Sequence, residues 1–333
     1  MLNRLFLAAA LFALAYSLIP TAQLSAQETE TDKKQNQSNT IRQATASINR
    51  LQKFTLRYRF DKDEEVRWKV EQIATGRTKV AGKDESYSLR TNSTKRWKIT
   101  SVDSRGNMTF EYMLEKLSLW NKIGEAEPSS YNSDKDVEAP AEFASDAEKV
   151  GRVLAKITID PMGKIVHRDS DLVDSSSFGA GNVTVPFPDQ PIAIDHQWSV
   201  PQELTARHDD GRVKQIKWRH LYTLKEVTDQ VATIEFKSQI LTPIEDPVIR
   251  AQIMQKVNSG LITFNLAEGR IVNKEINWDE TVQGYAGADS KTEYLARMTE
   301  SLVNVNAETT GIANTAAEVL IKPNDGKPIL RKR

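Results

Sequence analysis

The chain has 333 residues, with 45 basic and 45 acidic side chains, a formal net charge of zero and no cysteine. The even charge disfavours nucleic-acid binding, because such proteins usually carry a basic excess that displaces counterions from phosphate. The lack of cysteine excludes disulfides, thiolate nucleophiles and cysteine-ligated metals. Hydrophobic residues make up 39% and charged residues 27%, which is typical of a soluble globular protein.

The N-terminus has the features of an export signal. Arg4 supplies a positive charge, and an apolar run over 5–19 is broken only by Ser17. That run is shorter than the ~20 residues that cross a bilayer as a helix, and Ser25-Ala26 suits a signal peptidase. We expect a cleaved signal peptide over 1–26, no transmembrane span in the mature chain, and a location in the periplasm, the cell envelope or the medium. An uncleaved membrane anchor is the alternative.

The apolar period changes twice in the next part of the chain. Residues 27–40 are polar, so we expect a disordered tail. Apolar residues over 41–51 then recur at helical spacing, which predicts one short helix. Over 54–60 the period becomes two, and this predicts a strand whose buried face carries Phe54, Leu56, Tyr58 and Phe60.

Alternation of period two continues through most of the chain and is punctuated by turn residues. Asp160-Pro161-Met162-Gly163 has the residues of a tight turn, and similar turns follow at 228–230 and 267–269. Because hairpins dominate, we predict a mainly β fold of long, curved antiparallel sheets. A few short helices are expected, at 142–150 and after Asp246-Pro247, an N-cap followed by proline.

The strands fall into two groups, which predicts two similar half-barrel-like lobes over 41–170 and 200–307. Both contain the turn motif glycine-cation-Ile-Val, at Gly163-Lys164-Ile165-Val166 and at Gly269-Arg270-Ile271-Val272. We expect linkers at 171–199 and, within the first lobe, at the acidic stretch 121–150, and a C-terminal tail at 308–333. The acids of 121–150 lack the spacing of a calcium loop.

Three predicted strands carry a tryptophan between two cations: Arg67-Trp68-Lys69, Arg96-Trp97-Lys98 and Lys217-Trp218-Arg219. On a strand the tryptophan lies on one face and both cations on the other. The cations would meet water, an anionic surface or another envelope protein. The aromatic face is either a plain packed core or a concave surface that binds a lipid or other apolar ligand. The candidate ligand-binding residues are Trp68, Trp97, Phe110, Tyr112, Trp218, Phe236 and Phe264.

Motifs of catalysis are missing from the sequence. The four histidines lack metal-ligand spacing, and neither a P-loop nor a Gly-x-Ser-x-Gly elbow occurs. His208-Asp209-Asp210 is the most inviting polar cluster, but its context is typical of a turn. We therefore expect no enzyme, no catalytic residue, no metal and no cofactor.

Short motifs resemble a known family. They are the hairpin at 160–166, Pro186-Phe187-Pro188 ahead of 192–198, and the strand pair around 222–224 and 232–234. Together they are similar to an uncharacterised family of exported β-rich proteins common in planctomycete bacteria, for which no activity or catalytic residue is implied. More loosely, the strand pattern resembles the half-barrel of periplasmic lipoprotein carriers, an analogy of fold alone.

The sequence thus favours a non-enzymatic, exported cell-envelope protein that binds a lipid or other apolar ligand on a concave sheet face. An alternative is a structural or interaction protein whose sheets are fully packed. A hydrolase with an unrecognised site comes third.

Overall fold

The structure is a computed structural model that describes residues 52–169, 183–208 and 210–303. This part of the chain is mainly β and antiparallel, with a few short helices, as predicted. The expected signal peptide, the polar tail, the first helix and the C-terminal tail lie outside the described residues.

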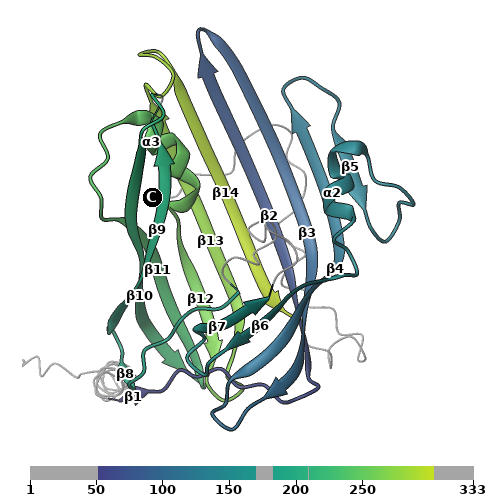
Figure 1. The fold of residues 1–333 in the computed structure, drawn as a ribbon, viewed down its shortest axis with the longest axis vertical. Helices are drawn as coiled ribbons and strands as arrows, with labels where there is room; N and C mark the ends of the chain where they lie inside the picture. Colours follow the sequence, from purple (N-terminus) through teal and green to yellow (C-terminus); the bar gives the residue numbers. More distant parts are fainter. Residues whose placement is uncertain (1–51, 170–182, 209, 304–333) are drawn as a thin grey trace, which may run out of the picture. The chain divides into compact units, whose positions relative to one another are not determined.

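One large sheet contains strands from both predicted lobes (Figure 1). Its order is β7-β6-β4-β3-β2-β14-β13-β12-β11-β10-β9, and β5 pairs with β4. Neighbours in this order are mostly hairpin partners, whereas β2 and β14 come from the two groups and join them. The similarity of the two groups stays a prediction. The strands of the sheet are β2 (Glu65–Val80), β3 (Lys83–Val102), β4 (Met108–Ile123), β5 (Ser129–Asn132), β6 (Val153–Ile159), β7 (Ile165–Asp169), β9 (Gln197–Arg207), β10 (Val213–Thr228), β11 (Val231–Ile240), β12 (Ser259–Asn265), β13 (Arg270–Gln283) and β14 (Lys291–Leu302).

Short helices connect or cover these strands. In α3 (Pro247–Ile253), the Asp246 side chain accepts a hydrogen bond from the Val248 N–H, which confirms the predicted N-cap. This helix buries Ile249 and Ile253 and packs against β9 and β13, and η3 (Met254–Lys256) continues it. Within the described ranges, none of the helices has the length and apolar character needed to cross a membrane.

Two stretches predicted as linkers contain ordered structure. The acidic stretch holds β5, η1 (Ala141–Phe143) and α2 (Ala144–Ala147), and its Tyr131 and Phe143 side chains are buried. In the second stretch, Val185 and Phe187 belong to the core. There, β8 (Ile192–Ala193) also pairs with β1 (Lys53–Phe54). A few apolar side chains therefore anchor segments whose composition is otherwise typical of loops.

The predicted strand over 54–60 is wrong, although the predicted alternation of buried and exposed side chains is correct for residues 55–60. Leu56, Tyr58 and Phe60 are buried, yet residues 55–61 belong to no strand. We call residues 55–61 the threaded segment. Its Tyr58 N–H donates to the Pro161 carbonyl (2.7 Å) and its Arg59 N–H donates to the Gly269 carbonyl (3.0 Å).

Those two hydrogen bonds show that the sheet curls. Pro161 lies in the β6–β7 turn and Gly269 in the β12–β13 turn, and β6 and β13 would lie about 24 Å apart in a flat sheet. Neighbouring residues of one chain, whose Cα atoms are only ~3.8 Å apart, bond to both turns. The curvature predicted from the sequence is therefore confirmed. We call the face that packs on the threaded segment the inner face.

The two matching turn motifs bind the same segment. Gly163 and Gly269 both have positive φ, 80° and 67°, which favours glycine. A Cβ atom at Gly163 would come within 2.3 Å of the Tyr58 ring, and one at Gly269 within 2.6 Å of the Arg59 nitrogen. Close approach to the threaded segment thus accounts for glycine at both positions, whether or not the turns share an origin.

Candidate functional site

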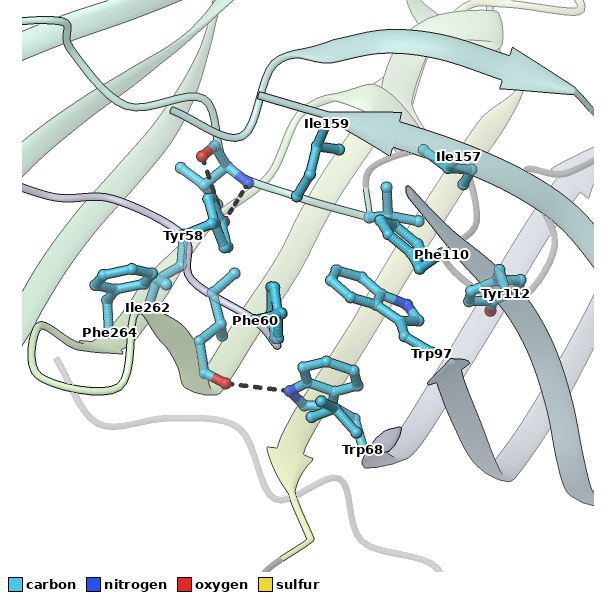
Figure 2. Packing of buried hydrophobic residues seen from close by; sticks show 14 of the residues in the cluster. Tyr58, Phe60, Trp68, Trp97, Phe110, Tyr112, Ile157, Ile159, Ile262 and Phe264 are labelled. Carbon is cyan, nitrogen blue, oxygen red and sulfur yellow. Dashed lines mark hydrogen bonds between the residues drawn. The ribbon is translucent and has the colours of Figure 1, made fainter. Parts of the chain in front are cut away.

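The seven aromatic residues predicted to line the inner face are all buried. Their exposure is 7% or less, and all except Trp218 belong to the main hydrophobic cluster. Figure 2 shows Trp68, Trp97, Phe110, Tyr112 and Phe264 from this set within that cluster. The threaded segment packs on them, with ring centroids 5.4 Å apart for Tyr58 and Phe264 and 5.9 Å apart for Phe60 and Trp97. The chain's own side chains therefore fill this region of the inner face, which we call the packed region. The ligand role of these seven residues stays a prediction.

Next to the packed region, the inward positions of five strands become polar. The packed region ends, on each of these strands, at a charged or polar residue of the inner face. This residue lies on the side of the packed region nearer the β2–β3 turn. Four of these side chains are at most 7% exposed and the serine is half-buried. We call this set the inner belt: Lys95 on β3, Glu300 on β14, Lys274 on β13, Ser238 on β11 and His220 on β10.

A buried ion triad forms one end of the inner belt. The Lys95 Nζ lies 2.6 Å from Glu300 Oε1, and the Lys274 Nζ lies 3.1 Å from Glu300 Oε2. Burial by itself raises the pKa of the Glu300 carboxyl, but the two ammonium groups outweigh it and hold that pKa well below its usual range. Burial lowers the pKa of Lys95 to about 8, although Glu300 acts in the opposite direction.

Two of the predicted aromatic residues lie against this triad. The Lys95 Nζ is 5.3 Å from the centroid of the Trp68 ring and 5.9 Å from that of Trp97. Both distances are within the range of cation–π attraction. The Trp68 indole N–H donates to the Ile271 carbonyl (3.1 Å), which holds the ring in place. The tryptophans therefore support the buried charge from the packed side.

The other end of the inner belt holds polar atoms without partners. His220 and Trp218 lie in contact on β10, with ring centroids 4.8 Å apart. Both side chains are 7% exposed, and neither His220 Nε2 nor Trp218 Nε1 has a hydrogen-bond partner. Burial lowers the pKa of His220, a hydrogen bond with the Asn258 side chain acts in the opposite direction, and the charge of Lys274 lowers it further. Buried polar atoms normally find partners, so two unpaired ones side by side are unusual.

On the far side of the inner belt the inner face is less covered. Several of its inward residues are apolar or aromatic side chains that are only half-buried, next to buried residues such as Ala74 and Ala296. They adjoin a small buried cluster that contains Tyr294 and Met254. Glu280 lies at the outer end of this surface, and burial raises its pKa. We call this surface the upper inner face, and it carries Tyr87, Leu89, Ile276, Trp278 and Met298.

Two residues of the polar cluster singled out in the sequence, His208 and Asp210, each pair with a different partner. His208 Nδ1 lies 2.5 Å from an oxygen of Asp246, the N-cap of α3, and Asp210 pairs with Arg212. Asp209 lies outside the described residues. Across the described ranges, no group of three or more His, Asp or Glu side chains is placed to hold a metal ion.

The cations that flank the tryptophans lie on the outer face of the sheet, as predicted. Arg67 and Arg96 pair there with Glu65 and Glu115, at distances of 2.8 to 3.3 Å. These two arginines are therefore neutralised by carboxylates of their own sheet. At these two positions the outer face does not present an unpaired cation.

A hollow of about 620 Å³ lies beside the threaded segment. It is lined by apolar residues such as Phe60 and Met108 and by three arginines. The arginines are already engaged: Arg57 donates to the Pro188 carbonyl, Arg59 to the Leu266 carbonyl, and Arg270 to Glu64. This hollow therefore offers fewer unsatisfied donors than the inner belt.

The charged residues of the inner belt were not predicted from the sequence. A signal existed for Lys95, which occurs two residues before Trp97 and so shares its face. Glu300 could be found in the same way, two residues before Leu302. The same spacing relates Lys274 to Ile276 and Trp278, whereas a β-bulge between Ile271 and Asn273 puts it out of step with Ile271.

Comparisons with known proteins give no family for this chain. No family model matches it, and no curated protein matches it. Among solved structures, it is similar to lipovitellin, from a study of lipid–protein interactions, with a TM-score of 0.41 and 10% identity over 74% of this chain. The match spans only 25% of the lipovitellin chain.

A second similarity is to the translocator domain of the autotransporter NalP from Neisseria meningitidis. The TM-score is 0.24 and the identity 7%, over 82% of this chain and 97% of that one. Because both TM-scores are below 0.5, neither similarity bears on what this chain binds. The likeness to β-rich proteins is loose, and the resemblance to the planctomycete family stays a prediction.

Proposed function

We propose that the chain is an exported, non-enzymatic binding protein of the cell envelope that holds an apolar or amphipathic molecule on its upper inner face. The observation that carries this proposal is the contrast within one face. The packed region is filled by the chain's own side chains, whereas Trp278, Met298 and their neighbours on the upper inner face are only half-buried. Concave surfaces with apolar walls and a few polar groups are the usual sites of small ligands.

The alternative, an interaction protein that docks through its outer face, is less favoured. It needs unpaired cations, and Arg67 and Arg96 are paired with Glu65 and Glu115. An exposed ion pair contributes little to binding until it is broken, since its charges already satisfy one another.

Binding of a neutral apolar fluorophore, N-phenyl-1-naphthylamine, tests the proposal. We expect saturable binding to the purified chain and displacement by dodecanol. Trp278→Ala should weaken binding about tenfold, which corresponds to the loss of ~1.4 kcal/mol of contact. Non-saturable binding would overturn the proposal.

Trp120→Ala is the matched control. Trp120 is also half-buried but lies on the outer face of β4, where the Arg90 guanidinium lies 5.0 Å from its ring. Removal of this ring should leave fluorophore affinity unchanged. Equal losses in the two variants would show that the fluorophore does not bind on the upper inner face.

A further inference from the structure

The ion triad of the inner belt has one cation too many. Lys95 and Lys274 share the single carboxylate of Glu300. Each carboxylate oxygen forms an ion pair with one of the two ammonium groups. In the described part of the chain, no second carboxylate pairs with either lysine. An ammonium group has three N–H donors, so most of these donors lack a carboxylate acceptor. Buried charge of this kind is costly unless a counter-charge is present.

The adjoining end of the inner belt also lacks acceptors. Trp218 Nε1 can only donate a hydrogen bond, and it is unpaired. His220 Nε2, in contact with Trp218, is unpaired as well and lies within the field of Lys274. The Trp218 observation is independent of the ion triad and indicates a missing group that accepts a hydrogen bond. His220 Nε2 is open to a donor or to an acceptor, according to the tautomer of the ring.

We propose that the inner belt binds the anionic head group, a carboxylate or a phosphate, of an amphipathic ligand whose apolar part lies on the upper inner face. This inference rests on the proposed function and names its ligand class. An anion supplies the missing negative charge to Lys274 and Lys95 and an acceptor to Trp218. Hydrogen bonds between ionised partners are about twice as strong as neutral ones.

The charges of the inner face also set the direction of the ligand. Glu280 lies at the outer end of the upper inner face, beyond Trp278 as seen from Lys274. An anionic head group is repelled at that end and attracted at the inner belt. The apolar part then extends from the inner belt past Met298 and Trp278.

Four ligands with the same alkyl chain test the inference: dodecanoate, dodecyl phosphate, dodecanol and dodecyltrimethylammonium. Each would displace N-phenyl-1-naphthylamine from the full chain at pH 7. We expect at least one of the two anions to bind about tenfold or more tighter than dodecanol, and the cation to bind most weakly. The tighter anion identifies the head group as carboxylate or phosphate.

The outcomes separate this inference from the proposed function. If dodecanol and both anions displace the fluorophore equally well, the anionic head group is wrong and the proposed function stands. If none of the four ligands displaces it, the proposed function fails and the inference fails with it. Tighter binding of the cation than of the anions would also overturn the inference.

Lys274→Met should abolish the preference for an anion and leave the affinity for dodecanol within about twofold. Lys69→Met is the matched control, since Lys69 is an exposed lysine that pairs with Glu71 on the outer face. It removes the same charge and should preserve the preference. Where Lys274→Met is unfolded by circular dichroism, Trp218→Phe takes its place, because it keeps a ring but removes the N–H donor. An unchanged preference in the folded variant would overturn the inference.

Discussion

Two clusters of charged side chains lie on opposite faces of the same sheet and differ in their balance. On the outer face, Arg67 and Arg96 meet two carboxylates, and all four side chains are 20% to 33% exposed. On the inner face, two lysines share Glu300, and all three side chains are at most 8% exposed. The cluster that water could most easily stabilise is balanced, and the cluster that water reaches least is not.

This difference is the physical basis of the binding role proposed for the inner belt. Balanced pairs at the surface of a sheet contribute modestly to stability and require nothing further. A buried triad with an excess cation lowers stability relative to an apolar core and is completed by a counter-ion. The inner belt therefore carries a buried positive charge that the described part of the chain does not compensate.

The largest expected effect comes from breaking the inner triad. Glu300→Gln leaves two buried ammonium groups without a carboxylate, and removal of one partner from a buried pair costs ~3–5 kcal/mol. Urea unfolding at pH 7 should show a loss of this size. Glu71→Gln, which breaks the exposed pair with Lys69, should cost less than about 1 kcal/mol. Similar losses in the two variants would show that burial does not distinguish the two faces.

Replacement of the whole triad by apolar residues should raise the free energy of unfolding or leave it unchanged, in contrast to Glu300→Gln. In the variant Lys95→Met/Lys274→Met/Glu300→Met, apolar side chains of similar length replace all three charges. Buried ion networks replaced in this way often leave stability unchanged or raise it by ~1–4 kcal/mol. Differential scanning calorimetry would detect the gain, and a loss as large as that of Glu300→Gln would show that the triad is needed for folding.

The inner lysine should also make stability depend on alkaline pH. The pKa of Lys95 falls from 10.5 to about 8 in the folded chain, so between these values the unfolded chain binds more protons. The free energy of unfolding therefore rises with pH between about 8 and 10.5. Below about pH 8 the folded chain bears the full cost of burying the charged Lys95 ammonium group. Burial raises the pKa values of Tyr58 and Tyr112 and lowers that of His220, so these neighbours keep their neutral form.

Melting curves at pH 7.5 and 10 would measure this effect. We expect the melting temperature of the natural chain to rise by roughly 4–8 °C relative to that of Lys95→Met, which corresponds to ~2 kcal/mol for a chain of this size. If the melting temperatures of the two proteins change equally between pH 7.5 and 10, Lys95 keeps its proton throughout this range.

The smallest effect is expected on the outer face. Glu115→Gln removes one of the two carboxylates that hold Arg67 and Arg96, and it should cost about 1 kcal/mol or less. Because partly exposed pairs are screened by salt, the difference should shrink between 0.05 M and 1 M sodium chloride. If the loss of stability does not depend on salt, the outer cluster is shielded from solvent like the buried triad, which would contradict the comparison.

The strands and their turns were accessible from the sequence because their causes are local. Alternation predicts a strand, and Asp160 with Gly163 predicts a turn, from a few neighbouring residues. The same holds for the cap of α3 at Asp246. The threaded segment could not be predicted in this way: its alternation is that of a strand, but its neighbours are two turns from distant parts of the chain.

The candidate site was predictable only in part for the same reason. The sequence placed Trp68 and Trp97 on the inner face, which is correct, and aromatic residues are easy to recognise as apolar. It could not show that Tyr58 and Phe60 would cover this region, nor that Lys274 would meet Glu300. Such contacts depend on the register of strand pairs and on a β-bulge. Neither can be predicted from the local alternation of apolar and polar residues.

The pairing of β2 with β14 has a consequence for the order in which the fold is made. Thr78 and Thr292 face each other across this pair, although 214 residues separate them in the chain. Contacts between such distant residues are slow to form, because a long loop must close first. During synthesis the hairpins can assemble as they emerge, but β2 keeps an unpaired edge until β14 arrives. Glu300 lies on β14, so the two lysines gain their shared carboxylate only when β14 joins the sheet.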